Sequence, residues 1–294
     1  MAKRGNFDIL SHYTWCIPSV ADMFIMLLFL LLGAVIGNVI VSVFTAAMGQ
    51  AAAMEYGTLV SYPVMFIPPM LWASSVSRRN ALSFKGARLD NNHFEPLGAW
   101  ACAALVILAT FTCGVLGDAA GSLLPPMPEW FETILKSMTT GKFWVNFLCV
   151  SIFAPFFEEW LCRGMILRGL LVRKVKPIWA IVISAVFFAF IHMNPWQAVP
   201  AFILGSLFGF VYYRTGSLKL TMLMHFTNNT VALVLGHISS LDEMDTWMDV
   251  FGSGYWYVFA ACVVLLGLAV NAFRRIHLSK PEGNIDIVPA AFDD

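Results

Sequence analysis

Long, uninterrupted apolar runs constrain the fold of this chain more than any other feature. Several of them extend for roughly 20 residues, the length that an α-helix needs to cross a bilayer. The composition agrees, since 59% of the 294 residues are hydrophobic and 12% are charged, whereas soluble domains carry about 25% charged residues. A membrane β-barrel would instead show short segments of alternating hydrophobicity. We therefore expect an all-α, polytopic transmembrane helical bundle.

About eight segments of the sequence are interpreted as spans, within a single membrane domain over 1–294 that ends in a polar tail at about 278–294. The second span contains three prolines and is expected to be kinked or broken. The fourth is so long that it must tilt or continue into the interface. The expected spans are 23–47, 57–76, 97–117, 143–171, 177–193, 196–213, 218–238 and 254–273.

Lysine and arginine are distributed unevenly around these spans. If both termini are placed in the cytoplasm, only Lys136 and Lys142 of the 18 lysines and arginines fall on the outer side. Cytoplasmic loops of membrane proteins carry such an excess of basic residues. We therefore predict cytoplasmic termini and an integral protein of a bacterial cytoplasmic membrane. The net charge of zero gives no indication of a nucleic-acid partner.

Four ionisable residues lie inside the spans, away from their ends: Glu158, Glu159, His192 and His225. Such groups are costly in a membrane and usually face a partner or a cavity. Arg163 follows Glu159 by four residues, so the two share a helix face and can form an ion pair. Glu158 lies about 100° around the helix from Glu159. The two adjacent carboxylates can therefore serve different purposes.

Two further pairs have the same spacing of four residues. Phe188 precedes His192 in the fifth span, and His225 precedes Asn229 in the seventh. Counting about 1.5 Å per residue from the cytoplasmic basic residues places these groups and Glu158 within the membrane. For His192, the short hairpin between the fifth and sixth spans is equally consistent with a position near the outer surface. The fourth, fifth and seventh spans can therefore bring them together in a cavity that opens to the cytoplasm.

This set of side chains suits water activation. A carboxylate beside a neutral imidazole can hold a water molecule and take its proton. A second histidine and an asparagine amide can donate hydrogen bonds to the oxyanion that forms when water attacks a carbonyl. Each part also has a purely structural alternative. These alternatives are a buried Glu159–Arg163 ion pair, an interhelical hydrogen bond from His192, a polar packing patch of His225 and Asn229, and a core position for Phe188.

Three motifs in this order resemble those of the CPBP family, the CAAX-protease and bacteriocin-processing (Abi) intramembrane proteases. The family motifs are E-E-x-x-x-R, F-x-x-x-H and H-x-x-x-N on successive spans. Here they read EEWLCR (158–163), FAFIH (188–192) and HFTNN (225–229), and the resemblance covers about 143–238. It implies a glutamate-dependent intramembrane endopeptidase whose catalytic helices are those of this segment.

The resemblance also implies roles for the two glutamates, for Arg163 and for His192. Glu158 would be the general base, acting on a water shared with His192. Glu159 and Arg163 would hold the Glu158 carboxylate in position. Members of the family are often described as metalloproteases, so a divalent metal such as zinc is left open. Its ligands would be Glu158, His192 and His225.

The remaining implied roles concern the oxyanion and the substrate. His225 and Asn229 would stabilise the oxyanion, Phe188 would line the site, and Asn228 could take the place of Asn229 if the helix is irregular there. The substrate would be a peptide or protein, such as a lipidated CAAX tail or a leader sequence. The alternative is a non-proteolytic immunity, scaffold or transport protein on the same fold. Transporters more often show repeated halves, which this sequence lacks. No oligomeric state is predicted.

Overall fold

The structure is a computed structural model that describes residues 19–80, 90, 94–132, 141–238 and 246–276. Its described residues form a bundle of helices without a strand among them. The expected all-α polytopic bundle is therefore confirmed. The predicted polar tail at about 278–294 lies outside the described residues.

Each of the eight expected spans coincides with a helical segment. Within the described residues, 6 segments are long and apolar enough to cross a membrane, and α9 is a shorter apolar helix. The count of eight spans therefore stays a prediction. The elements are α1 (Val20–Met48), α2 (Gln50–Ala52), η1 (Ala53–Gly57), α3 (Thr58–Asn80), α4 (Gly98–Gly121), α6 (Phe143–Asn146), η2 (Phe147–Phe153), α7 (Ala154–Glu159), η3 (Trp160–Leu167), α8 (Arg168–Val172), α9 (Pro177–Phe190), α10 (Pro195–Thr215), α11 (Leu218–Leu235), α12 (Trp247–Phe251), η5 (Gly252–Gly254) and α13 (Tyr255–Arg274).

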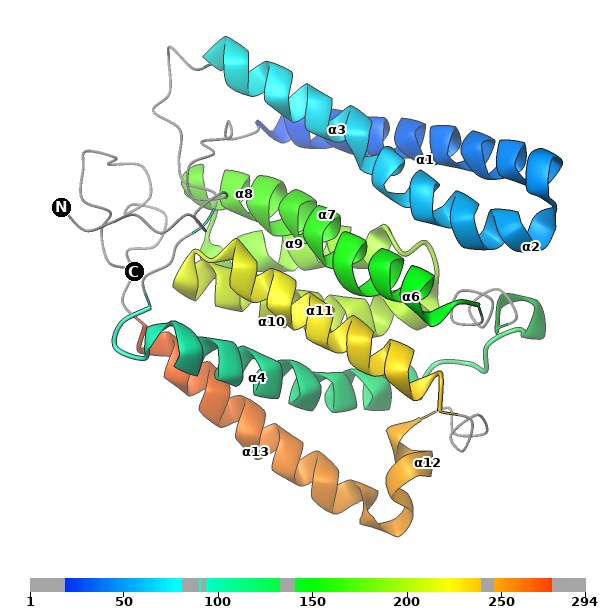
Figure 1. The fold of residues 1–294 in the computed structure, drawn as a ribbon. Helices are drawn as coiled ribbons and strands as arrows, with labels where there is room; N and C mark the ends of the chain where they lie inside the picture. The colour runs from blue at the N-terminus through cyan, green and yellow to red at the C-terminus, as the bar shows by residue number, and fades with distance from the viewer. Residues whose placement is uncertain (1–18, 81–89, 91–93, 133–140, 239–245, 277–294) are drawn as a thin grey trace.

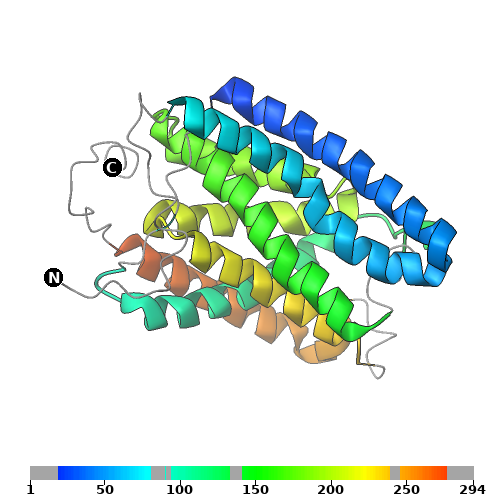
Figure 2. The same cartoon turned by 45° about the horizontal axis from the view of Figure 1, so that its top comes forward.

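The helices that carry the motifs occupy the middle of the bundle. Figure 1 shows α1 beside α3 along one side and α4 beside α13 along the other, with α7, α10 and α11 between the two pairs. Figure 2 shows the same grouping from a second direction. The first turn of α1 and the last turn of α13 lie at the same end of the bundle (Figure 1). A cytoplasmic location of both termini requires this arrangement, and the side of the membrane that this end faces stays a prediction.

Large apolar side chains are exposed on the outer helices. Phe24 and Leu28 of α1, and Val264 and Leu268 of α13, have exposed fractions between 60% and 66%. Extended apolar surfaces of this kind are rare on soluble monomers, whereas lipid tails solvate them without cost. Together with the apolar lengths of the helices, this exterior identifies an integral membrane protein.

The fourth expected span is a continuous helical rod that widens twice. α6, η2, α7, η3 and α8 follow one another without a break, and η2 and η3 are π-helical. A side chain from a neighbouring helix bonds to a carbonyl in each wide stretch. The Asn229 amide donates to the Val150 carbonyl at 2.8 Å, and the Ser184 hydroxyl donates to the Cys162 carbonyl at 2.9 Å. π-Helical turns occur frequently at functional sites, and the motif glutamates lie between these two.

The second expected span is not broken at its prolines. α3 continues through Pro63, Pro68 and Pro69, after a π-helical turn that precedes it. Membrane helices tolerate proline because neighbouring groups can satisfy the carbonyls that the missing N–H leaves free. The α1–α3 pair therefore stays intact alongside the fourth span, where it contributes a side chain to the site described below.

Candidate active site

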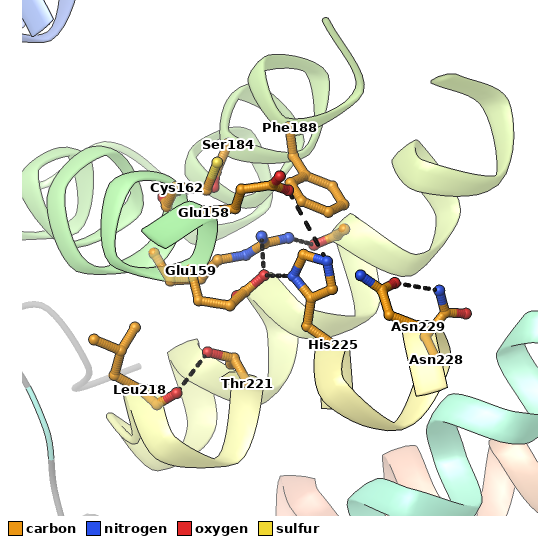
Figure 3. A network of polar contacts seen from close by, with 12 residues as sticks. Glu158, Glu159, Cys162, Ser184, Phe188, Leu218, Thr221, His225, Asn228 and Asn229 are labelled. Atoms are coloured by element: carbon orange, nitrogen blue, oxygen red, sulfur yellow. Dashed lines mark hydrogen bonds and ion pairs between the residues drawn. The ribbon is translucent and has the colours of Figure 1, made fainter. Parts of the chain in front are cut away.

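The motif residues converge at the centre of the bundle. Glu158 and Glu159 end α7, Arg163 lies in η3, Phe188 in α9 and His225 in α11. Figure 3 shows the two carboxylates and the His225 ring pointing toward one another, with the Phe188 ring beside them. The side chains of Glu159, Arg163 and His225 are buried, with exposed fractions of 0%, 0% and 5%.

Glu159 forms the centre of a buried polar network. Its Oε1 accepts a hydrogen bond from Arg163 Nη1 at 2.8 Å, which is the ion pair that the four-residue spacing predicts. The same oxygen lies 3.0 Å from His225 Nδ1. Because a carboxylate oxygen can only accept, Nδ1 carries a proton, and in the neutral form of the imidazole Nε2 is then the nitrogen with the free lone pair. Glu159 therefore orients His225 as well as neutralising Arg163.

The buried guanidinium of Arg163 contacts several protein groups besides Glu159. Its Nη2 donates to the Gly205 carbonyl at 2.9 Å. Its guanidinium carbon lies 4.6 Å from the centre of the Phe188 ring and 5.3 Å from the centre of the Phe208 ring. A guanidinium over an aromatic face gains cation–π attraction, which is larger where water is excluded. The cost of burying this cation is thus offset by a carboxylate, a carbonyl and two rings.

Glu158 has a different environment from its neighbour. Its Oε1 accepts a hydrogen bond from the Tyr62 hydroxyl of α3. Its Oε2 is buried without a hydrogen-bond partner among the described residues, and it lies 3.9 Å from His225 Nε2. Polar atoms separated by more than about 3.5 Å are often bridged by a water molecule. The prediction that the two adjacent carboxylates serve different purposes agrees with these contacts.

His192 lies just after the C-terminal end of α9, in the turn that leads to α10. Its Nδ1 donates to the Phe188 carbonyl at 2.8 Å. The centre of the Phe188 ring is 5.1 Å from that of His192 and 5.4 Å from that of His225, and both contacts are edge-on. Phe188 therefore contacts both histidines, in keeping with its predicted position lining the site. The predicted sharing of a water between His192 and Glu158 stays a prediction.

The predicted metal ligands do not form a metal-binding arrangement. Among the described residues, no three His, Cys, Asp or Glu side chains lie close enough together to hold an ion. Glu158 Oε2 and His225 Nε2 are 3.9 Å apart, and the described residues bring no third ligand of these types to them. Zinc requires at least three protein ligands in a compact geometry. The set Glu158, His192 and His225 therefore does not fit a metal as arranged here.

The two neighbouring asparagines of α11 have different surroundings. Asn229 donates from Nδ2 to the Val150 carbonyl at 2.8 Å and accepts at Oδ1 from Asn228 Nδ2 at 3.1 Å. Asn228 lies toward α4, where a Cβ placed on Gly114 would be 3.9 Å from Asn228 Oδ1. Asn229 thus faces the helix that carries Glu158, and Asn228 supports it (Figure 3). The Asn229 amide has a second N–H that could donate to an oxyanion. The oxyanion role of Asn229 stays a prediction.

Tyr62 is the site residue that the motifs did not indicate. It lies in α3, directly before Pro63, and its hydroxyl reaches Glu158 across 96 positions of sequence. A phenol hydroxyl inside a membrane span needs a hydrogen-bond partner, and this requirement is the one signal in the sequence that could have singled it out. The sequence does not indicate which residue this partner is, so only the structure connects Tyr62 with the site.

Gly205 allows Arg163 and Phe188 to occupy their positions. A Cβ added there would lie 3.0 Å from Phe188 Cδ1 and 3.2 Å from Arg163 Nη2. Gly205→Ala is expected to lower the free energy of unfolding by about 1–2 kcal/mol, because overpacking outweighs the better helix propensity of alanine. Denaturant titration in detergent measures this loss. Gly267→Ala in α13, where a Cβ meets nothing within 4 Å, is the matched control and should be neutral or slightly stabilising.

Comparison with known proteins identifies the segment that holds the motifs. Residues 140–231 match the family model for Rce1-like proteins, described as type II CAAX prenyl endopeptidase Rce1-like. Neither the curated proteins nor the solved structures gave a match. The matched segment contains all three motifs, at 158–163, 188–192 and 225–229. The CPBP-type resemblance that the motifs indicated is therefore confirmed over 140–231, where the chain is similar to Rce1-like proteins.

Proposed function

We propose that the protein is an intramembrane endopeptidase of the CAAX-processing type, in which Glu158 and His225 hold the attacking water. One observation carries the proposal. Glu158 Oε2 is buried without a hydrogen-bond partner among the described residues, and it faces His225 Nε2 at 3.9 Å. When His225 is neutral with its proton on Nδ1, both atoms are hydrogen-bond acceptors, and a water molecule has two hydrogens to offer them. The Rce1-like match supports a peptide or protein substrate and a membrane setting.

In the proposed reaction, Glu158 takes a proton from the water while the water oxygen attacks the carbonyl carbon of the peptide bond. His225 Nε2 accepts a hydrogen bond from the second O–H of the water, which keeps the lone pair of the water oxygen directed at the carbonyl. When the tetrahedral intermediate breaks down, the C–N bond opens and the proton held by Glu158 passes to the leaving nitrogen. No covalent enzyme intermediate is needed, and atoms and charges balance without another reactant.

The other polar residues have supporting roles in this scheme. Glu159 accepts from His225 Nδ1 at 3.0 Å and so fixes which ring nitrogen faces the water. Arg163 holds the Glu159 carboxylate in place through the ion pair at 2.8 Å. Asn229 is the proposed donor to the oxyanion, because its amide has a second N–H beside the one that binds the Val150 carbonyl. The sequence-based assignment paired the water with His192, and we now favour His225 because its Nε2 faces Glu158 Oε2 at 3.9 Å.

Cleavage of peptides by the purified protein tests this function. Peptides ending in C-a-a-X sequences, with and without a prenyl group on the cysteine, are incubated with the protein in detergent, and the products are identified by mass spectrometry. We expect cleavage, with the prenylated peptide preferred. In parallel, the termini of membrane proteins are compared between cells with the wild type and cells with Glu158→Gln. Absence of cleavage together with identical termini would overturn the proposal.

A further inference from the structure

We infer that Tyr62, which lies outside the Rce1-like segment, is a positioning residue that determines which oxygen of Glu158 is offered to the water. This inference rests on the proposed function. Tyr62 donates to Oε1 of Glu158, and Oε2 is the oxygen that faces His225. A free carboxylate can exchange its two oxygens by rotation about its terminal torsion, which has a broad energy minimum. One hydrogen bond to Oε1 removes that freedom and leaves Oε2 for the water.

The position of Tyr62 is set by aromatic packing between α3 and α7. The ring centres of Tyr62 and Phe66, one helical turn apart, are separated by 5.7 Å. Phe66 is 1% exposed, and its ring stacks on that of Phe157 at 5.0 Å with an interplanar angle of 13°. Phe157 directly precedes Glu158. The stack that docks α3 on α7 therefore also sets the register in which Tyr62 meets the carboxylate.

The helix that carries Tyr62 is held close on its other side by α1. A Cβ placed on Gly33 of α1 would lie 2.1 Å from the Met65 carbonyl oxygen of α3, so the two backbones touch directly. α1 and α3 form a helical hairpin whose connection includes η1. In η1, Glu55 accepts a hydrogen bond from the Lys142 backbone N–H at 3.1 Å, just before α6 begins. The hairpin is thus attached to the fourth span at two places. A donor fixed in this way can hold Glu158 through repeated turnovers.

Tyr62→Phe tests this inference because it removes the hydroxyl and keeps the ring. With a cleavable peptide, we expect kcat to fall about 10- to 100-fold, the effect of losing one hydrogen bond to a charged group. We expect KM to change less than about twofold, because Glu158 rather than the substrate is affected. Tyr255→Phe is the control for the loss of a tyrosine hydroxyl, since Tyr255 is 1% exposed and packs in a separate cluster with Val115 and Cys262. It should leave kcat unchanged.

A double-mutant cycle separates positioning from packing. Glu158→Asp draws the carboxylate back by one methylene, beyond reach of the Tyr62 hydroxyl. Tyr62→Phe in that background is expected to lower kcat by less than about twofold more, since its contact is already lost. An equal loss of kcat in both backgrounds, or a Tyr62→Phe enzyme as fast as or faster than the wild type, would overturn the inference. Full activity of Glu158→Gln would instead overturn the proposed function, whatever Tyr62 does.

Discussion

Glu158→Gln is expected to lower the rate of peptide hydrolysis by about 10²- to 10⁴-fold, the typical contribution of a positioned general base. Glutamine has nearly the same size and can still accept the hydroxyl of Tyr62 at its carbonyl oxygen, but it cannot take a proton from water. The Glu158 side chain is 13% exposed and makes no described ion pair with a lysine or arginine. Its replacement should therefore leave the unfolding midpoint close to that of the wild type.

The control for this variant shows whether the loss of one negative charge elsewhere in the chain also lowers the rate. Glu95→Gln makes the same chemical change at an exposed position of the described chain and should leave the rate unaltered. Initial rates are measured on the same peptide and detergent preparation, beside denaturant titrations of each protein. Hydrolysis by Glu158→Gln at more than about a tenth of the wild-type rate would contradict the role of Glu158 as base.

The parts of the fold that sequence could predict are those determined within one helix. Apolar runs of sufficient length identify spans in any arrangement, and all eight expected segments are helical. The Glu159–Arg163 pair was likewise predictable, because a four-residue spacing places both side chains on one face before any other helix is considered. Their distance of 2.8 Å confirms it.

The contacts that sequence could not provide are those between helices. The bond from Glu159 to His225 joins positions 66 apart, and the bond from Tyr62 to Glu158 joins positions 96 apart. Each depends on how far one helix is rotated and shifted against another, and periodicity within a helix leaves both quantities open. The π-helical stretches η2 and η3 also shift the facing direction of later residues relative to an ideal helix. The contacts of Glu158 with Tyr62 and of Glu159 with His225 were therefore visible only in three dimensions.

Arg163→Met is expected to lower the free energy of unfolding by about 3–5 kcal/mol, the cost of leaving one member of a buried ion pair without the other. Glu159 is 0% exposed, and its Oε2 has no hydrogen-bond partner among the described residues. Without Arg163 it would keep only the bond from His225. The Gly205 carbonyl would also lose the hydrogen bond from Arg163 Nη2. Denaturant titration in detergent measures the loss, and Arg275→Met, at an exposed position, is the matched control.

Two further variants show that the charge is responsible rather than the volume of the side chain. Arg163→Lys should recover only part of the loss, because an ammonium group cannot reach the Glu159 carboxylate and the Gly205 carbonyl in one plane, nor stack between two rings as a guanidinium does. The double variant Glu159→Gln with Arg163→Met should be more stable than Arg163→Met alone, since it buries no uncompensated charge. If the double variant were no more stable, packing against Phe188 and Phe208 would account for the effect. The Glu159–Arg163 pair would then contribute orientation of His225 rather than stability.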